Sequence, residues 1–86
     1  MKNMIIYVSP NVQEKLLHKH RIEVDELKDA LKYGKPKIIK QEGKIYIAIT
    51  HHFRYITVVF EYDKPTANII TAYPSSESHI RRYKKK

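Results

Sequence analysis

The segment from Lys44 to Tyr73, KIYIAITHHFRYITVVFEYDKPTANIITAY, decides the fold of this chain. It holds three runs, residues 45–50, 55–61 and 68–73, in which β-branched or aromatic residues alternate with other residues. Alternation with a period of two, interrupted by turn residues, is typical of strands. Three such runs in succession predict an antiparallel meander. The middle run is expected to be the central strand, with Arg54 at its start.

Two helices are predicted upstream of the meander. The pair Ser9–Pro10 favours a helix start, because serine caps well and proline suits the first helical position. The first helix is expected to run from residue 10 to about residue 18 or 19. The second is expected from Val24 to Tyr33, with acidic residues in its first turn and lysines later, which complements the helix dipole. Gly34 follows where a left-handed residue is wanted.

Short segments complete the predicted order. Met4–Val8 has the length of a strand, and Lys37–Lys40 is expected to be a brief edge strand guarded by lysines. A short helix through about Tyr83 is plausible, and residues 81–86 are expected to be a frayed basic tail. The order is β-α-α-β-β-β. It predicts an α+β domain spanning residues 1–86, in which two helices cover one face of a small antiparallel sheet.

Composition excludes several classes of function. The 86 residues suit one domain, and the absence of cysteine removes disulfides, thiolate metal sites and thiol nucleophiles. With two glycines, the chain lacks the glycine-rich loops that cradle nucleotide phosphates. No apolar run approaches the about 20 residues of a membrane span, and residues 1–4 begin no credible signal peptide. We therefore expect a cytoplasmic protein with no cofactor and no membrane partner.

The charge is the most informative part of the composition. Seventeen Lys and Arg against nine Asp and Glu give a net charge of +8, which favours polyanions or an acidic partner protein. The alternative is that lysine only keeps the surface soluble. The acidic residues gather between Glu23 and Asp29, whereas residues 81–86 carry five positive charges. This polarity favours a one-sided binding surface.

Several landmarks resemble the RelE/ParE superfamily of small toxins, and in layout especially the BrnT-like proteins and related small domains. The resemblance covers roughly residues 16–83. It rests on a turn before an acidic helix, on two strands and on a basic C-terminal segment: Lys19-His20-Arg21-Ile22 before Val24-Asp25-Glu26-Leu27, Arg54–Phe60, Ile69–Tyr73 and Arg81-Arg82-Tyr83.

The resemblance implies a toxin of a type II toxin–antitoxin system that cleaves mRNA, which could be bound to the ribosome, without a metal. It also implies an antitoxin partner, either acidic or DNA-binding, that holds the toxin inactive. Some superfamily members instead poison DNA gyrase, and many have no demonstrated activity. Members use basic and aromatic residues on the concave sheet face and in the C-terminal segment.

Metal-free RNA cleavage needs a base for the 2′-OH, cations for the phosphorane and an acid for the 5′-oxygen. The candidate catalytic residues are Arg54 as the transition-state cation and His51, His52 and His79 as proton-transfer groups. Adjacent residues of a strand point to opposite faces, so at most one of His51 and His52 can face the site. Because neighbouring antiparallel strands end and start at the same edge, Arg54 and the C-terminal cluster are expected to converge.

The candidate RNA-binding residues are aromatic or cationic, and the cations could equally form the patch that an antitoxin covers: Tyr55, Tyr73, Arg81, Arg82, Tyr83 and Lys84. Tyr46 and Tyr55 are expected on the sheet face opposite the isoleucine row. There they form an exposed platform if the helices cover that row, and core if they do not. No histidine pair has the spacing of a helical zinc motif. The alternatives are a non-catalytic nucleic-acid-binding module and a basic protein-interaction domain.

Overall fold

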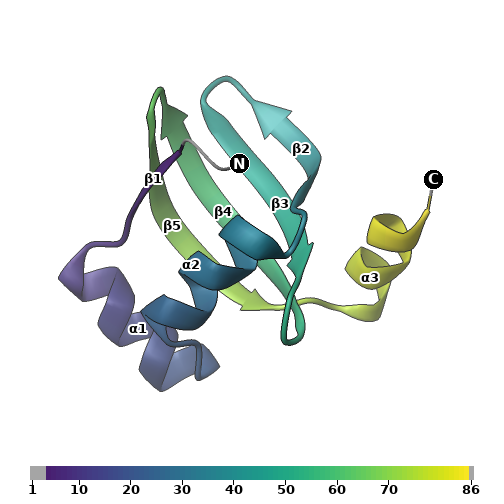
Figure 1. Ribbon diagram of the computed structural model, residues 1–86, viewed down its shortest axis with the longest axis horizontal. Coiled ribbons are helices and arrows are strands. Elements are labelled where there is room, and N and C mark those ends of the chain that lie inside the picture. The colour runs from purple at the N-terminus through teal and green to yellow at the C-terminus, as the bar shows by residue number, and fades with distance from the viewer. Residues whose placement is uncertain (1–3, 86) are drawn as a thin grey trace.

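The computed structural model describes residues 4–85 and has an α+β architecture (Figure 1). The order is β-α-α-β-β-β-β-α, with the bounds β1 Ile5–Tyr7, α1 Pro10–His20, α2 Val24–Tyr33, β2 Lys37–Glu42, β3 Ile45–His51, β4 Tyr55–Asp63, β5 Thr66–Pro74 and α3 Glu77–Lys84. The fold class is confirmed. Four strands follow the two helices: β2, the edge strand that was expected at residues 37–40 but is missing from the order β-α-α-β-β-β, and the three strands of the meander.

The five strands form one sheet in the order β1-β5-β4-β3-β2. β4 is central, as the length of its alternating run predicts. The expectation of a purely antiparallel sheet was wrong, because β1 runs parallel to β5 and pairs Ile5 with Thr66. The two helices after β1 carry the chain away from the sheet, so no hairpin constrains the direction of β1.

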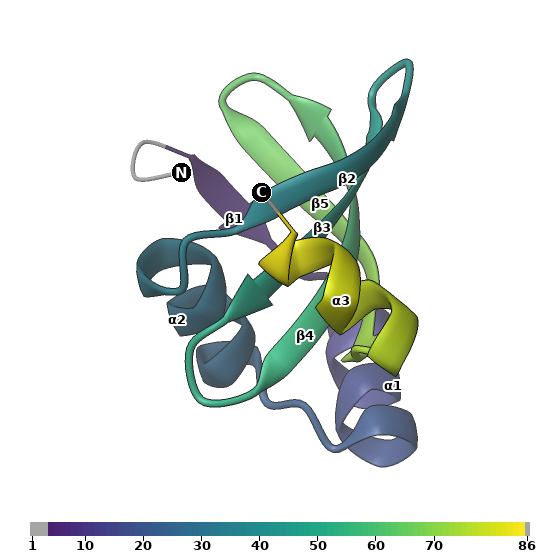
Figure 2. The ribbon, with the colours of Figure 1, turned by 90° about the vertical axis from the view of Figure 1, so that its right-hand side faces the viewer.

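The sheet carries helices on both faces, and strand register decides which residues each face receives. Across β3 and β4, Ala48 pairs with Val58, and both side chains lie in the core beneath α1 and α2. The neighbouring pair, Ile49 with Thr57, therefore points to the other face, where α3 lies (Figure 2). We call these the α1/α2 face and the α3 face.

The two tyrosines that were expected to share a face lie on opposite faces. Tyr46 pairs across the sheet with Phe60 and stacks on it at a centroid distance of 5.5 Å in the core. Tyr55 pairs with His51 on the α3 face. The expectation of a shared face was wrong, because the pairing register puts the isoleucine row of β3 and the Ile56 row of β4 on opposite faces of the sheet.

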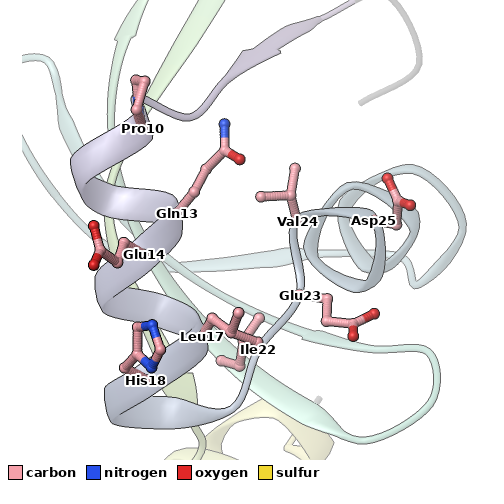
Figure 3. Close-up of a pocket in the computed structure, with 9 residues that line it drawn as sticks. All are labelled: Pro10, Gln13, Glu14, Leu17, His18, Ile22, Glu23, Val24 and Asp25. Atoms are coloured by element: carbon pink, nitrogen blue, oxygen red, sulfur yellow. The ribbon is translucent and has the colours of Figure 1, made fainter.

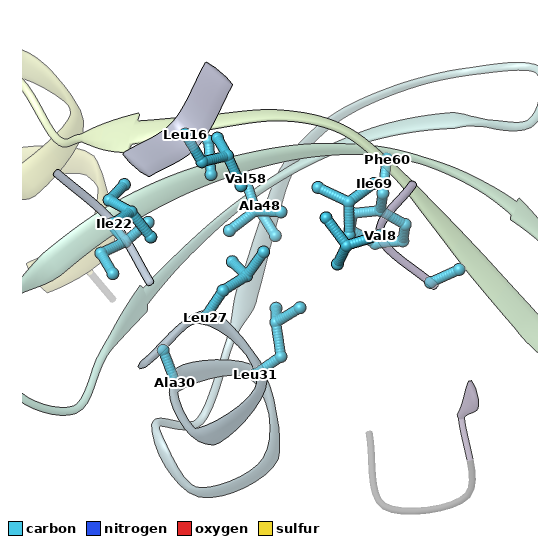
Figure 4. Close-up of a cluster of buried hydrophobic side chains, with 13 residues drawn as sticks. Val8, Leu16, Ile22, Leu27, Ala30, Leu31, Ala48, Val58, Phe60 and Ile69 are labelled. Carbon is cyan, nitrogen blue, oxygen red and sulfur yellow. The ribbon is translucent and has the colours of Figure 1, made fainter. Parts of the chain in front are cut away.

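The hydrophobic core lies between α1, α2 and the sheet (Figure 4). Leu16 of α1 and Leu27 and Leu31 of α2 are fully buried, as are Val58 and Phe60 of the central strand. Burying side chains of this size stabilises a fold by about 1.5–3 kcal/mol each relative to exposure. This packing holds two short helices that would be marginal in isolation.

The ends of α1 and α2 position the residues around them. Ser9 accepts a hydrogen bond from the Val12 amide at 3.3 Å, as a helix cap does. Arg21 takes the left-handed conformation after α1, with φ 53°. Gly34 was expected to be left-handed, but its φ is −88° and Lys35 takes that conformation instead. Position 34 has no room for a side chain, because an added Cβ would lie 2.4 Å from the Ala30 carbonyl oxygen.

α3 docks on the sheet through its last turn. Ser76 caps the helix by accepting a hydrogen bond from the His79 amide at 3.2 Å. Arg82 donates to the Ile39 carbonyl at 2.9 Å, and the Tyr83 hydroxyl donates to the Lys35 carbonyl at 3.0 Å. Residues 81–84 are therefore the anchored end of a helix and not a frayed tail, while Lys86 lies outside the described residues. No helix within residues 4–85 is long and apolar enough to cross a membrane.

Candidate functional site

Histidine and tyrosine rings gather at one end of the sheet, most of them on the α3 face. We call them the histidine–tyrosine row, and its members come from α1, β3, β4, β5 and α3: His20, His51, Tyr55, Tyr73, His79 and Tyr83. The ends of β3 and β5 and the start of β4 meet at this edge, and α3 lies over it (Figure 2). The row brings together five of the candidate residues predicted from the sequence.

His79 is the best-oriented imidazole of the row. Its Nδ1 lies 3.0 Å from the Thr57 hydroxyl oxygen, which is itself 2.8 Å from the Ser75 hydroxyl oxygen. Its ring centroid lies 6.4 Å from that of Tyr73. Thr57 is buried, so the contact fixes the ring through Nδ1. Nε2 has no hydrogen-bond partner among residues 4–85 and is the nitrogen through which the ring can exchange a proton with a ligand.

The second imidazole, His51, lies at the end of β3. It stacks on Tyr55 with a centroid distance of 4.1 Å and an interplanar angle of 15°. Tyr83 packs edge-on against Tyr55 with 5.7 Å between ring centroids, and Lys84 Nζ lies 5.8 Å from the Tyr55 centroid. His79 and Tyr83 are one helical turn apart, so α3 presents both to the sheet. Together with Lys84, the row thus combines proton-transfer groups, aromatic faces and a cation.

Arg54 does not join this row. It shares the register of Ile56 and faces α1 and α2, where its Nε donates to Glu26 Oε2 at 2.8 Å and its Nη2 to Glu26 Oε1 at 3.1 Å. Nη2 also donates to the Arg21 carbonyl at 2.8 Å. The expected convergence of Arg54 with the C-terminal cluster was wrong, because α3 docks on the opposite face of the sheet.

The environment of Arg54 keeps its guanidinium charged and hydrogen-bonded to Glu26. The hydrogen bonds to Glu26 raise the pKa of the Arg54 guanidinium above its ordinary value; desolvation opposes this effect and Coulombic attraction to Glu26 adds to it. The two side chains are 34% and 20% exposed. A bidentate pair of this kind fixes the orientation of the guanidinium, so Arg54 ties the β3–β4 turn to α2 and to the turn after α1.

The remaining candidates lie around the row. His52 is in the β3–β4 turn beside Tyr33, at a centroid distance of 6.0 Å. It does not share the surroundings of His51, as the alternation of side chains predicts. Arg82 is engaged by the Ile39 carbonyl of the edge strand. Arg81 is exposed and lies with Glu77 beside a shallow hollow on the outer side of α3.

Sequence reasoning missed three members of the site. His20, at the end of α1, lies 6.1 Å from Tyr73 between ring centroids. Thr57 and Ser75 hold His79 through the hydroxyl contacts described above. Thr57 pairs with the candidate Tyr73 across β4 and β5, so the predicted pairing of these two strands could have indicated the threonine. The position of His20 depends on where α1 packs, and no pattern in the sequence indicates it.

A separate groove of about 550 Å³ lies between α1 and the start of α2 (Figure 3). Leu17, Ile22 and Val24 supply apolar surface, and carboxylates stand around it from Glu14, Glu23 and Asp25. Its acidic rim disfavours a polyanion, and none of the candidate site residues lines it. No group of three His, Asp or Glu side chains in the described part of the chain is arranged to hold a metal ion.

Comparison with known proteins shows the fold of this chain. No family model matches it. No curated protein matches its sequence. Among solved structures, it is similar to the ribonuclease toxin BrnT of Brucella abortus, with a TM-score of 0.67 and 16% sequence identity. The match covers 86% of this chain and 99% of the toxin chain. The chain therefore has the fold of a known ribonuclease toxin.

Proposed function

We propose that this protein is a toxin-like endoribonuclease that cleaves mRNA without a metal. The observation that carries the proposal is the histidine–tyrosine row, in which His79 and His51 lie with three tyrosines and Lys84 at one end of the sheet. The net charge of +8 favours an RNA substrate. The structural similarity to a ribonuclease toxin supports the same assignment.

The chemistry follows from the groups in the row. One imidazole takes the proton of the 2′-OH, the 2′-oxygen attacks the adjacent phosphorus, and a 2′,3′-cyclic phosphate forms as the bond to the 5′-oxygen breaks. The second imidazole, as imidazolium, protonates the leaving 5′-oxygen. His79, fixed through Nδ1, and His51 are the two proton-transfer groups. Tyr73 stacks on a base, and Lys84 neutralises phosphate.

The proposal includes a partner that controls the activity. An acidic or DNA-binding antitoxin would cover the α3 face and its cations, so that RNA could not reach the row. Such a partner fits the charge of the last helix, which holds Arg81, Arg82 and Lys84 in its final turn. Whether the substrate is free mRNA or mRNA on the ribosome is part of the test.

The test is cleavage of mRNA, free and on ribosomes, by purified protein in the presence of a chelator. We expect products ending in cyclic phosphate, and no cleavage of a substrate with 2′-deoxy residues. His79→Ala and His51→Ala should each lower the rate by about 10²–10⁴-fold. His18→Ala is the matched control, because His18 lies at the groove between α1 and α2. Intact RNA in both settings, or equal effects of all three variants, would refute the proposal.

One observation favours a second function, a nucleic-acid-binding module without catalysis. The only arginine at the start of the central strand is committed to Glu26 and to the Arg21 carbonyl, on the face away from the row. The site then lacks a fixed guanidinium for the phosphorane. This function predicts salt-sensitive RNA binding with no cleavage, and no difference between wild type and His79→Ala in binding.

A further inference from the structure

The β3–β4 turn carries an unusual exposed aromatic group. Phe53 is 82% exposed, and Tyr33, at the end of α2, is 60% exposed. His52 lies beside Tyr33 with 6.0 Å between ring centroids. We call Tyr33, His52 and Phe53 the aromatic tip. Phenylalanine is usually buried, so an almost fully exposed one next to two further exposed rings indicates a surface that contacts a ligand.

The surroundings of the aromatic tip are cationic. Lys32 Nζ lies 5.3 Å from the Tyr33 centroid, and Lys35 is exposed two residues after Tyr33. Arg54, at the base of the turn, is neutralised by Glu26. Asp29 is one turn earlier on α2 and marks the acidic side of that helix. A polyanion that follows the positive charges therefore runs from the tip towards Lys35 and α3.

Hydrogen bonds connect the aromatic tip to the histidine–tyrosine row. The Gly34 carbonyl accepts from the His51 amide at 3.3 Å and from the Tyr83 hydroxyl at 3.2 Å. Tyr33 is the residue before Gly34, and His52 the residue after His51. The tip and the row are thus adjacent parts of one edge, linked through the Gly34 carbonyl.

We propose that the aromatic tip is a base-stacking subsite for single-stranded RNA, with Phe53 as the ring on which a base lies. The inference rests on the proposed function, because it places the substrate strand across the row and onto the tip. Exposed aromatic rings beside cations bind single strands in this way, since every base has a face to stack. A duplex, whose bases are already stacked, would not use the tip.

The absence of tryptophan from the chain makes a direct test available. Phe53→Trp introduces a single tryptophan at the tip, and a base that stacks on it quenches its fluorescence. The probe is a 2′-O-methyl single strand of mixed sequence, which binds but cannot be cleaved. We expect saturable quenching, with a midpoint that matches the anisotropy of the same strand carrying a fluorescent label.

Two controls test whether the quenching requires bases and whether it is specific to the aromatic tip. An abasic strand of the same length and charge should bind more weakly and should not quench. Leu17→Trp puts the same reporter at another exposed apolar position, 48% exposed on α1 beside the acidic groove, where we expect no quenching. Phe53→Ala should weaken binding of the 2′-O-methyl strand by about 5- to 150-fold, and Leu17→Ala should not weaken it.

Each outcome bears on a different claim. If labelled RNA binds while the Phe53→Trp emission stays unchanged, or if the abasic strand quenches equally, the subsite is refuted. If quenching occurs but RNA is never cut, the subsite stands and the nuclease proposal fails. If no RNA binds, both are refuted.

Discussion

Gly34 occupies a tight backbone position. An added Cβ would lie 2.4 Å from the Ala30 carbonyl oxygen, 2.5 Å from Thr50 Oγ1 and 2.9 Å from the His51 carbonyl oxygen. Thr50 cannot move aside freely, because it is buried and its hydroxyl donates to the same Ala30 carbonyl at 2.6 Å. Gly34→Ala should therefore lower the free energy of unfolding by about 1–3 kcal/mol, measured by urea denaturation.

Gly43 provides the matched control for this substitution. It has a φ of +58°, but nothing lies within 4 Å of an added Cβ. Gly43→Ala should cost only the left-handed strain, about 1 kcal/mol. A Gly34→Ala protein no less stable than Gly43→Ala would show that the contact around Gly34 is not as close as described.

The Arg54–Glu26 pair is expected to act on stability. Arg54→Ala removes two hydrogen bonds to Glu26 and one to the Arg21 carbonyl. A double-mutant cycle with Glu26→Ala should give a coupling energy of about 0.5–1.5 kcal/mol, reduced from a buried value by partial exposure of both side chains. A coupling energy near zero in chemical denaturation would contradict the geometry.

The direction of the pKa shift of Arg54 determines how its contribution to stability depends on pH. Because the pKa of Arg54 is raised in the folded state, its contribution to stability is fully present below the unfolded pKa. It is lost only as the pH rises through the folded pKa, far into the alkaline range. The Arg54 contribution should therefore be equal at pH 7 and pH 9.

At the scale of elements, polar contacts of its last turn help to hold α3 on the sheet. Tyr83→Phe removes the hydroxyl that donates to the Gly34 and Lys35 carbonyls, and it should destabilise the docking of α3 by about 0.5–1.5 kcal/mol. Hydrogen exchange should show faster exchange in residues 77–84 and unchanged protection in β4. Equal loss of protection in both elements would instead show that α3 and the sheet unfold as one unit.

The elements themselves could be predicted from local patterns. Alternation located β3, β4 and β5, and Ser9–Pro10 located the start of α1, because caps and period-two patterns depend on neighbours in sequence. Faces could not be predicted in the same way. The isoleucine row of β3 suggests one buried face, but only the pairing of β3 with β4 shows that Tyr46 packs against the core and Tyr55 does not.

The candidate site was predicted in composition and not in arrangement. The sequence indicates a basic, histidine- and tyrosine-rich edge, and five of the candidates meet there. The partner of Arg54 is a carboxylate on a distant helix, and α3 docks through backbone carbonyls at Gly34 and Lys35. Such contacts are set by tertiary packing, which no local pattern encodes.

At the scale of the whole molecule, the +8 charge predicts salt-dependent binding. The logarithm of the RNA association constant should fall linearly with the logarithm of salt concentration. Lys84→Ala should reduce the magnitude of this slope by about 0.7, the value for one phosphate contact of a single strand. Lys15→Ala, an exposed lysine on α1, is the control and should leave the slope unchanged. Equal slopes for both variants would place the RNA elsewhere.

The parallel pairing of β1 with β5 has a consequence for how the molecule matures. Ile5 can pair only after Thr66 has been synthesised. β1 is therefore made before the other strands but is among the last to pair. Until then the outer edge of β5 offers unpaired backbone amides and carbonyls, a template for strands of other chains. Newly synthesised molecules at high concentration would be most prone to aggregate before β1 has paired with β5.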